Sequence, residues 1–152
     1  MMKHLIPLTS IAFLLLVGCD KSPSESAQDV AEVRQDANLR VDEAREDADK
    51  TITRADDQVA DAQQDYVKSD HDALGDLAEA ESAAQIKTAH ANFDVAEAEA
   101  KGRSDIAEEK CGVLKGVERD ACLSSAEATL AADLAAATAT RDAALVVAER
   151  HD

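Results

Sequence analysis

The chain has 152 residues, with 32 Asp and Glu against 16 Lys and Arg, which gives a formal net charge of −16 at pH 7. So acidic a surface repels nucleic acid and anionic lipid headgroups, which excludes both as direct partners of the polypeptide. Only 2% of the residues are aromatic, so little material exists for a substrate pocket, whereas alanine, the strongest helix former, is abundant. We predict an all-α protein of elongated helices, arranged as a coiled coil or a helical hairpin.

Residues 1–18 have the order of a secretory signal peptide, with a basic start at Lys3, an apolar stretch and a small residue before a cysteine. The apolar stretch is too short to span a membrane. The last residues, Leu16-Val17-Gly18-Cys19, resemble the lipobox of bacterial lipoproteins. The resemblance implies cleavage before Cys19, a diacylglycerol on its sulfur and an acyl chain such as palmitate on its new N-terminus, with no other cofactor. The alternative is an ordinary signal peptide followed by an accidental cysteine.

The next residues bear on where such a lipoprotein would be retained. Asp20, Lys21 and Ser22 resemble the retention signals of Gram-negative lipoproteins, in which Asp in second position, or Lys and Ser in third and fourth, keep the protein on the inner membrane. The resemblance implies a protein of the bacterial cell envelope that faces the periplasm, on the inner membrane in preference to the outer. Several acyl chains anchor firmly, because each buried methylene contributes about 0.8 kcal/mol.

Residues 19–29 hold the anchored N-terminus and the start of the first helix, where Pro23 suits the first helical position. Residues 30–68 then repeat every eleven residues. Eleven residues make three turns at about 3.67 per turn, so apolar columns run nearly straight along the helix. These columns form the predicted self-association seam: Val30, Val33, Ala37, Val41, Ala44, Ala48, Ile52, Ala55, Val59 and Tyr66. The alternative is an ordinary amphipathic helix whose register is coincidental.

A second helical segment is predicted over residues 69–110, after a kink or short turn near residues 69–76. Its helix runs from about Asp72 to Lys101, and its inner side contains Leu74, Leu77, Ile86, Ala89, Phe93, Ala96 and Ala100. Gly102, followed by Ser104 and Asp105, indicates a stop and a new helix cap.

Cys111 and Cys122 remain as an even pair outside the cytoplasm once the lipobox cysteine carries lipid. On one continuous helix their Cα atoms would lie about 16 Å apart, whereas a disulfide needs them within about 7 Å. A disulfide therefore requires the helix to break, which Gly112 and Gly116 allow, so residues 111–122 would form a stapled corner. The alternatives are a redox-active thiol pair and a zinc site with His90 as the nearest further ligand.

An Ala-rich C-terminal helix is predicted over residues 117–150, with a stripe that contains Leu123, Leu130, Leu134 and Leu145. The corner before it contains Glu108-Glu109-Lys110-Cys111, Leu114, Gly116, Arg119-Asp120-Ala121-Cys122 and Ala126. In these residues it resembles small Ala-rich proteobacterial envelope proteins, in which two cysteines bracket a corner between helices. Residues 20–66 more loosely resemble murein-type lipoproteins, which are lipidated helices assembled as coiled coils. Those proteins can end in a Lys that is linked to peptidoglycan, whereas this sequence ends in Asp152, so that linkage is not expected.

No motif for catalysis stands out, since the sequence has no phosphate-binding Gly loop, no Gly-x-Ser-x-Gly, no His-Glu-x-x-His and no EF-hand loop. Asp70-His71-Asp72 resembles a metal or acid–base cluster, but a solvated helix cap explains it better, and no metal site is predicted. We expect a non-enzymatic, lipid-anchored periplasmic protein with a structural, spacer or scaffold role, which self-associates through the seam. The alternative is a monomeric accessory lipoprotein that docks on an envelope protein complex. No small-molecule substrate is expected.

Overall fold

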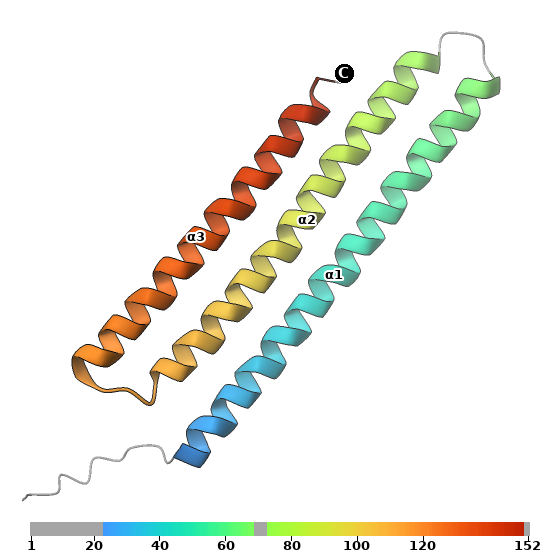
Figure 1. Cartoon of the computed structure of the whole chain (residues 1–152). Helices are drawn as coiled ribbons and strands as arrows, with labels where there is room; N and C mark the ends of the chain where they lie inside the picture. Colours follow the sequence, from blue (N-terminus) through green and yellow to red (C-terminus); the bar gives the residue numbers. More distant parts are fainter. Residues whose placement is uncertain (1–22, 69–72, 151–152) are drawn as a thin grey trace, which may run out of the picture.

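The computed structural model describes residues 23–68 and 73–150, and these fold into three α-helices. In chain order they are α1 (Pro23–Lys68), α2 (Ala73–Cys111) and α3 (Gly116–Ala148). Each helix runs antiparallel to the one before it (Figure 1). The predicted all-α fold of elongated helices is confirmed. The predicted signal peptide, lipobox and retention residues, and the Asp70-His71-Asp72 motif, lie outside the described residues.

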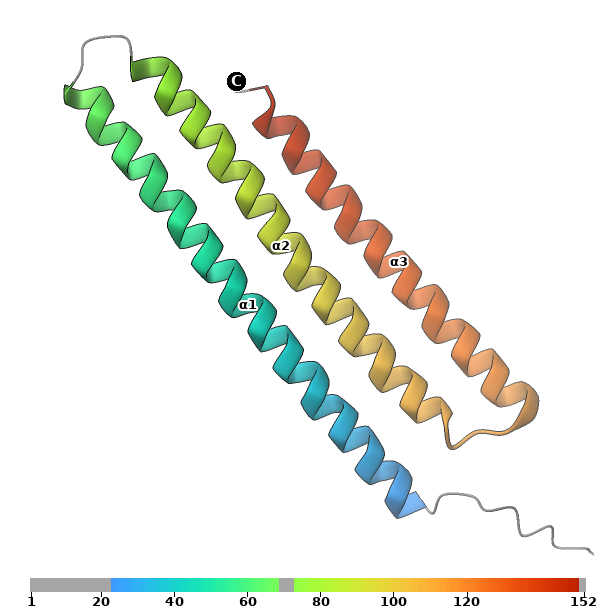
Figure 2. The ribbon, with the colours of Figure 1, turned by 180° about the vertical axis from the view of Figure 1, so that it is seen from behind.

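The helices lie side by side in a row with α2 in the middle, as the front view in Figure 1 and the rear view in Figure 2 both show. α1 packs against α2 and α2 packs against α3, but no Cα atom of α1 comes within 8 Å of α3 in the described segments. A row has no central axis at which three apolar stripes meet. Each outer helix therefore buries one side only, whereas α2 must bury two opposite sides.

The contact between α1 and α2 is built from small residues spaced eleven apart. On α1, Ser26, Ala37 and Ala48 form a buried column, and α2 presents Ala91 and Gly102 to it. A Cβ atom on Gly102 would lie only 3.1 Å from the Cβ of Ala37. The two helices therefore approach so closely at this point that glycine is the residue that fits without a shift.

The predicted helix stop at Gly102 is wrong, because α2 continues to Cys111. A single glycine costs a helix interior only about 1 kcal/mol, and packing on both sides of α2 offsets that cost. Ser104 caps no new helix. It is buried, and its hydroxyl donates a hydrogen bond of 3.0 Å to the Glu108 carboxylate one turn later in the same helix.

The opposite side of α2 packs against α3. Here Ala89, Ala100 and Cys111 form a buried column of α2, again spaced eleven apart. At the far end of the contact the Ser82 hydroxyl donates a hydrogen bond of 3.2 Å to the Ala148 carbonyl oxygen. Between these ends the Arg141 guanidinium lies 4.7 Å from the centre of the Phe93 ring, which it partly covers. The inner side predicted for α2 is thus the side that faces α3.

The core of the described residues consists almost entirely of alanine. Its buried apolar members are Cys111 and nine alanines: Ala37, Ala48, Ala55, Ala84, Ala89, Ala91, Ala100, Ala126 and Ala148. Small side chains contribute little apolar area each, but they let the helix backbones come close together along their whole length.

Candidate functional site

The corner between α2 and α3 is closed by the predicted disulfide. Cys111 and Cys122 are joined with their Cα atoms 5.7 Å apart, because the chain reverses between them. The Gly112 and Leu114 amides donate 3.0 Å hydrogen bonds to the carbonyl oxygens of Glu109 and Cys111, which ends α2. α3 then begins at Gly116, whose φ of 54° is in the left-handed region that favours glycine. The stapled corner is confirmed, and the two glycines stand where the chain turns.

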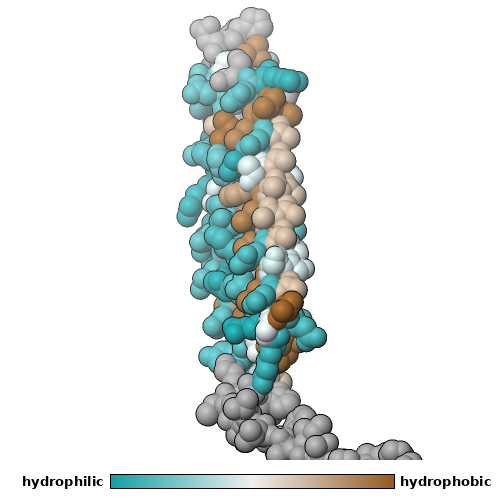
Figure 3. Space-filling model, turned by 90° about the vertical axis from the view of Figure 1, so that its left-hand side faces the viewer, coloured by the Kyte–Doolittle hydropathy of each residue, from teal (hydrophilic) through white to brown (hydrophobic). Residues whose placement is uncertain are grey.

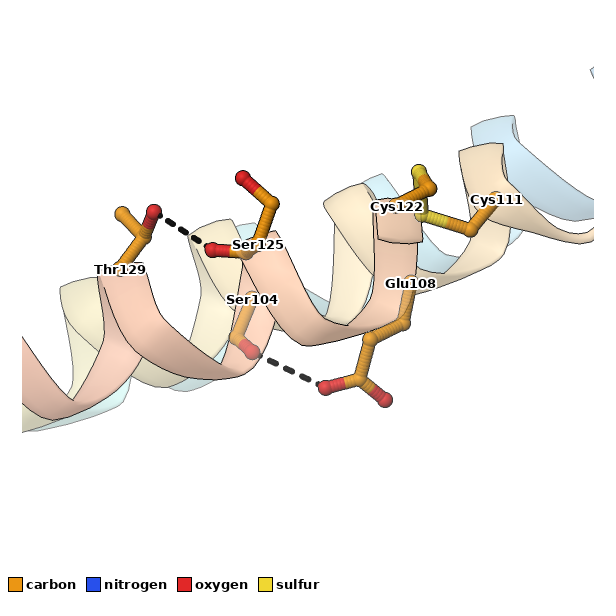
Figure 4. Close-up of a disulfide and its surroundings, with 6 residues drawn as sticks. All are labelled: Ser104, Glu108, Cys111, Cys122, Ser125 and Thr129. Carbon is orange, nitrogen blue, oxygen red and sulfur yellow. Dashed lines mark hydrogen bonds between the residues drawn. A yellow bond between two sulfur atoms is a disulfide. The ribbon is translucent and has the colours of Figure 1, made fainter. Parts of the chain in front are cut away.

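The side chains around the disulfide are small, and the Ser104 and Thr129 hydroxyl groups both donate hydrogen bonds. Figure 4 shows the Ser104 hydroxyl hydrogen-bonded to the Glu108 carboxylate on α2. It also shows the Thr129 hydroxyl hydrogen-bonded to the Ser125 carbonyl oxygen on α3, at 2.9 Å. A shallow hollow of about 280 Å³ lies beside the sulfur atoms and is lined by residues of both helices, with Ala100, Ala107, Ala126 and Leu130 as its apolar members apart from the two cysteines. Of the described residues that line it, the charged ones are Arg103 and Asp133, which form an ion pair at 3.0 Å. The hollow therefore offers apolar surface and paired charges.

The predicted self-association seam faces α2 of the same chain. Ala55 is completely buried, and Tyr66, at the end of α1, is 37% exposed. Ala37 and Ala48 are also buried, and the other members are partly buried: Val30, Val33, Val41, Ala44, Ile52 and Val59. A second copy could reach this seam only by displacing α2. Self-association through the seam stays a prediction, and its residues already have an intramolecular role.

Ion pairs flank the contact between α1 and α2. Arg40 pairs with Asp105, and Arg45 pairs with Glu99 at 2.7 Å. All four side chains remain at least one-third exposed, so each pair contributes at most about 1 kcal/mol. Their main effect is on register, because each arginine meets its acid only when the eleven-residue columns are aligned.

The outer side of α1 is polar and charged. Glu46 and Lys50 pair there at 2.7 Å, one helical turn apart. The hydrogen bond and the positive charge of Lys50 lower the pKa of the Glu46 carboxyl, and the same contact raises the pKa of the Lys50 ammonium. Asp57 and Asp61 continue this exposed side toward the end of the helix.

No group of three or more His, Cys, Asp and Glu side chains gathers at metal-binding distance within residues 23–68 and 73–150. Of the residues considered for a zinc site, His90 is exposed on α2, and Cys111 and Cys122 are joined in the disulfide. In the same described segments, no helix is both long enough and apolar enough to cross a membrane.

The sequence analysis missed the outer side of α3 as a candidate surface. This side carries Val117, Ala121, Ser124, Ala128, Ala132, Ala135, Ala139, Ala143 and Val146, all of them exposed. The signal was present, because Ala121, Ala132 and Ala143 are spaced eleven apart like the columns of α1.

Comparison with known proteins identifies no relative: no family model matches the chain, and neither a curated protein nor a solved structure matches it. The functional argument therefore rests on the chain's own residues and geometry.

Proposed function

We propose that this protein is a non-enzymatic, lipid-anchored spacer or scaffold of the bacterial cell envelope, which faces the periplasm. The observation that carries the proposal is a long helical row whose first helix begins beside the lipobox cysteine. Cys19 precedes Pro23 by four residues, so at most about 14 Å of extended chain separates the lipid attachment site from the start of α1. Anchorage at Cys19 fixes one end of the row at the membrane.

The arrangement of the helices gives the row a proximal and a distal end. The start of α1 and the disulfide corner lie at one end, and the end of α1, the start of α2 and the end of α3 lie at the other (Figure 1). α1 has 46 residues, so it is about 69 Å long at 1.5 Å per residue. A row that stands upright on its anchor would hold its distal end at that height. The acidic polypeptide favours this pose, because anionic headgroups repel it.

A spacer must resist bending, and three features support such stiffness. α2 is packed on both sides, ion pairs hold α1 in register with α2, and the disulfide fixes the corner at which α3 begins. The eleven-residue spacing, at about 3.67 residues per turn, keeps the contacts nearly straight along the helices, with at most a slight right-handed drift.

The second candidate is an accessory lipoprotein that docks on an envelope protein complex. The observation in its favour is that α2 of the same chain covers the seam of α1, so the seam needs no second copy to bury it. In this case the anchor would deliver the row to a complex in the membrane, and the row would act as an adaptor.

The anchor is tested by Cys19→Ser in the full chain, with labelled palmitate and membrane fractionation as readouts. We expect the unchanged chain to take up label and to sediment with membranes, and the variant to lose both properties. Ser22→Ala is the matched control, because it leaves the thiol in place and should keep the label. A Cys19→Ser chain that still sediments with membranes would contradict the proposal.

The upright pose is tested with Val67 and Val117, which are both 84% exposed and lie at opposite ends of the row. Each is replaced by cysteine and labelled with a fluorophore, and the lipidated chain is placed in vesicles that contain an acceptor dye. We expect strong energy transfer from Val117→Cys, at the proximal end, and weak transfer from Val67→Cys. Equal transfer from the two sites would show that the row lies along the membrane, which rules out a spacer.

A further inference from the structure

The corner between α2 and α3 exposes large apolar side chains at the proximal end of the row. Val113 is 55% exposed and Val117 is 84% exposed, and Leu114 between them is partly buried. Figure 3, in which the proximal end lies at the bottom, shows strongly hydrophobic surface at this end of the row. Exposed apolar groups that cluster are typical of contacts with proteins or membranes. Residues 110–117, which contain this cluster, are called the corner tip below.

The charge of the corner tip is opposite to that of the whole chain. The tip contains Lys110 and Lys115, both exposed, and no acidic residue, and Glu109 and Glu118 come next on either side. Salt screens charges beyond about 8 Å, so a surface that touches the tip responds mainly to the two lysines and to these nearest acids. The repulsion from anionic headgroups that the net charge of −16 imposes on the row is therefore weaker here.

The corner tip is level with the beginning of α1. Ala37 of α1 lies against Gly102 of α2, and the two helices are antiparallel. Eleven residues further toward the proximal end, Ser26 in the first turn of α1 is therefore level with Val113, just beyond the end of α2. An anchor at Cys19 would thus bring the tip to the surface of the bilayer when the row stands upright.

The corner tip has a fixed shape before it meets any surface. The disulfide between Cys111 and Cys122 joins the two helices beside it, and the Gly112 and Leu114 amides donate hydrogen bonds to carbonyl oxygens at the end of α2. A contact through the tip therefore requires little further ordering of the chain. Amides that are already hydrogen-bonded also lose less on leaving water than unpaired ones do.

The distal end also exposes apolar side chains, but it exposes acids with them. Val67 is 84% exposed there, and Asp65 and Asp76 are exposed at the same end. At the corner tip, exposed valines and two lysines occur together. This combination suits a bilayer with anionic headgroups, because apolar groups can enter the acyl boundary while cations stay among the phosphates.

We propose that the corner tip is a second membrane contact, beside the lipid anchor. Val113 and Val117 enter the boundary between headgroups and acyl chains, and Lys110 and Lys115 bind lipid phosphate groups. Two attachments at the proximal end hold the row upright, whereas a single tether would let it tilt. The inference rests on the proposed anchor at Cys19, which places this end of the row at the membrane.

The test uses the absence of tryptophan from the sequence, which makes one introduced tryptophan a unique fluorescent reporter. The lipidated full chain with Val117→Trp is placed in vesicles of phosphatidylethanolamine and phosphatidylglycerol with brominated acyl chains, because bromine quenches tryptophan only at close contact. We expect strong quenching from Val117→Trp and little from Val67→Trp, which puts the same side chain at the distal end. Equal quenching of the two reporters would overturn the proposal.

Sedimentation of the same samples reports on the anchor separately. Chains that do not sediment with the vesicles would contradict the proposed function, and the inference with it. Chains that sediment while Val117→Trp is not quenched would contradict the membrane contact of the tip and leave the anchor intact.

Further substitutions in the Val117→Trp chain test the residues of the tip. Val113→Asp puts a carboxylate where the apolar contact would form and should remove most of the quenching, whereas Val67→Asp, the matched change at the distal end, should leave it unchanged. Replacing Lys110 and Lys115 by glutamine should lower the ratio of inserted to withdrawn tips by about fivefold for each lysine. Full quenching in the Val113→Asp chain would refute the contact, and full quenching without the lysines would refute their part in it.

Discussion

Replacing Gly102 by alanine adds one methyl group where α1 and α2 lie closest together. The new Cβ would stand 3.1 Å from the Cβ of Ala37, whereas carbon atoms in favourable contact are about 3.5–4.0 Å apart. The Ala37 Cβ cannot rotate away, because it is bonded directly to the backbone. The helices would therefore have to separate locally by about half an ångström.

Two effects of opposite sign decide the outcome. Alanine is a better helix former than glycine by about 1 kcal/mol, which favours the Gly102→Ala variant. Overpacking of a tight contact costs about 1–3 kcal/mol, which disfavours it. We expect the free energy of unfolding to stay the same or to fall by up to about 2 kcal/mol. Gly75→Ala is the matched control, because no atom of the described residues beyond its own helical turn lies within 4 Å of its new Cβ, and it should gain up to about 1 kcal/mol.

The measurement is urea denaturation of the oxidised protein, followed by far-UV circular dichroism. A second variant isolates the steric term: Ala37→Gly combined with Gly102→Ala moves the methyl group from one helix to the other and should restore stability to near its original value. Residues in direct contact couple by about 0.5–3 kcal/mol in such double-mutant cycles. If Gly102→Ala stabilises the protein as much as Gly75→Ala does, the helices are not in close contact there and the reasoning fails.

Three further predictions concern the corner, the α2–α3 contact and the outer side of α1. Cys122→Ser opens a loop with a sequence separation of 11, so it should cost about 3 kcal/mol and should speed hydrogen exchange in α3 more than in α1. Arg141→Gln removes the cation above the Phe93 ring and should cost about 0.5–1 kcal/mol in the same denaturation assay, whereas Arg141→Lys should cost less. Lys50→Gln should raise the pKa of Glu46 to its ordinary value in an NMR titration, because Lys50 lowers it. Since the folded pKa of Glu46 is the lower one, the contribution of the pair is present above the unfolded pKa and is lost as the pH falls through the folded value.

Much of the fold could be predicted from local chemistry. The eleven-residue columns of α1 indicate one long helix with a straight stripe, and the structure shows that helix over its full predicted length. The corner follows once Cys111 and Cys122 are taken as a disulfide, because they cannot meet on an unbroken helix and two glycines stand between them. These inferences succeed because each depends on residues close in the sequence.

The arrangement of the helices could not be predicted in the same way. α2 has small residues on two opposite sides, such as Ala91 toward α1 and Ala100 toward α3, so its sequence shows no single apolar face. The stop predicted at Gly102 is wrong, because the need for glycine there depends on Ala37, from a distant part of the chain, lying against it. The seam of α1 gave no indication of which helix would cover it, since small apolar residues accept a neighbour from the same chain or from another.

The eleven-residue spacing has a consequence for the length of the molecule. Adding or removing eleven residues in a helix turns it by three whole turns, so every side chain after the change keeps its side of the helix. If all three helices change together, Ala still meets Ala or Gly, and the disulfide corner is untouched. The row can therefore become longer or shorter only in units of about 16 Å. The length of such a row is therefore a variable that can change by whole units while every lateral contact keeps its form.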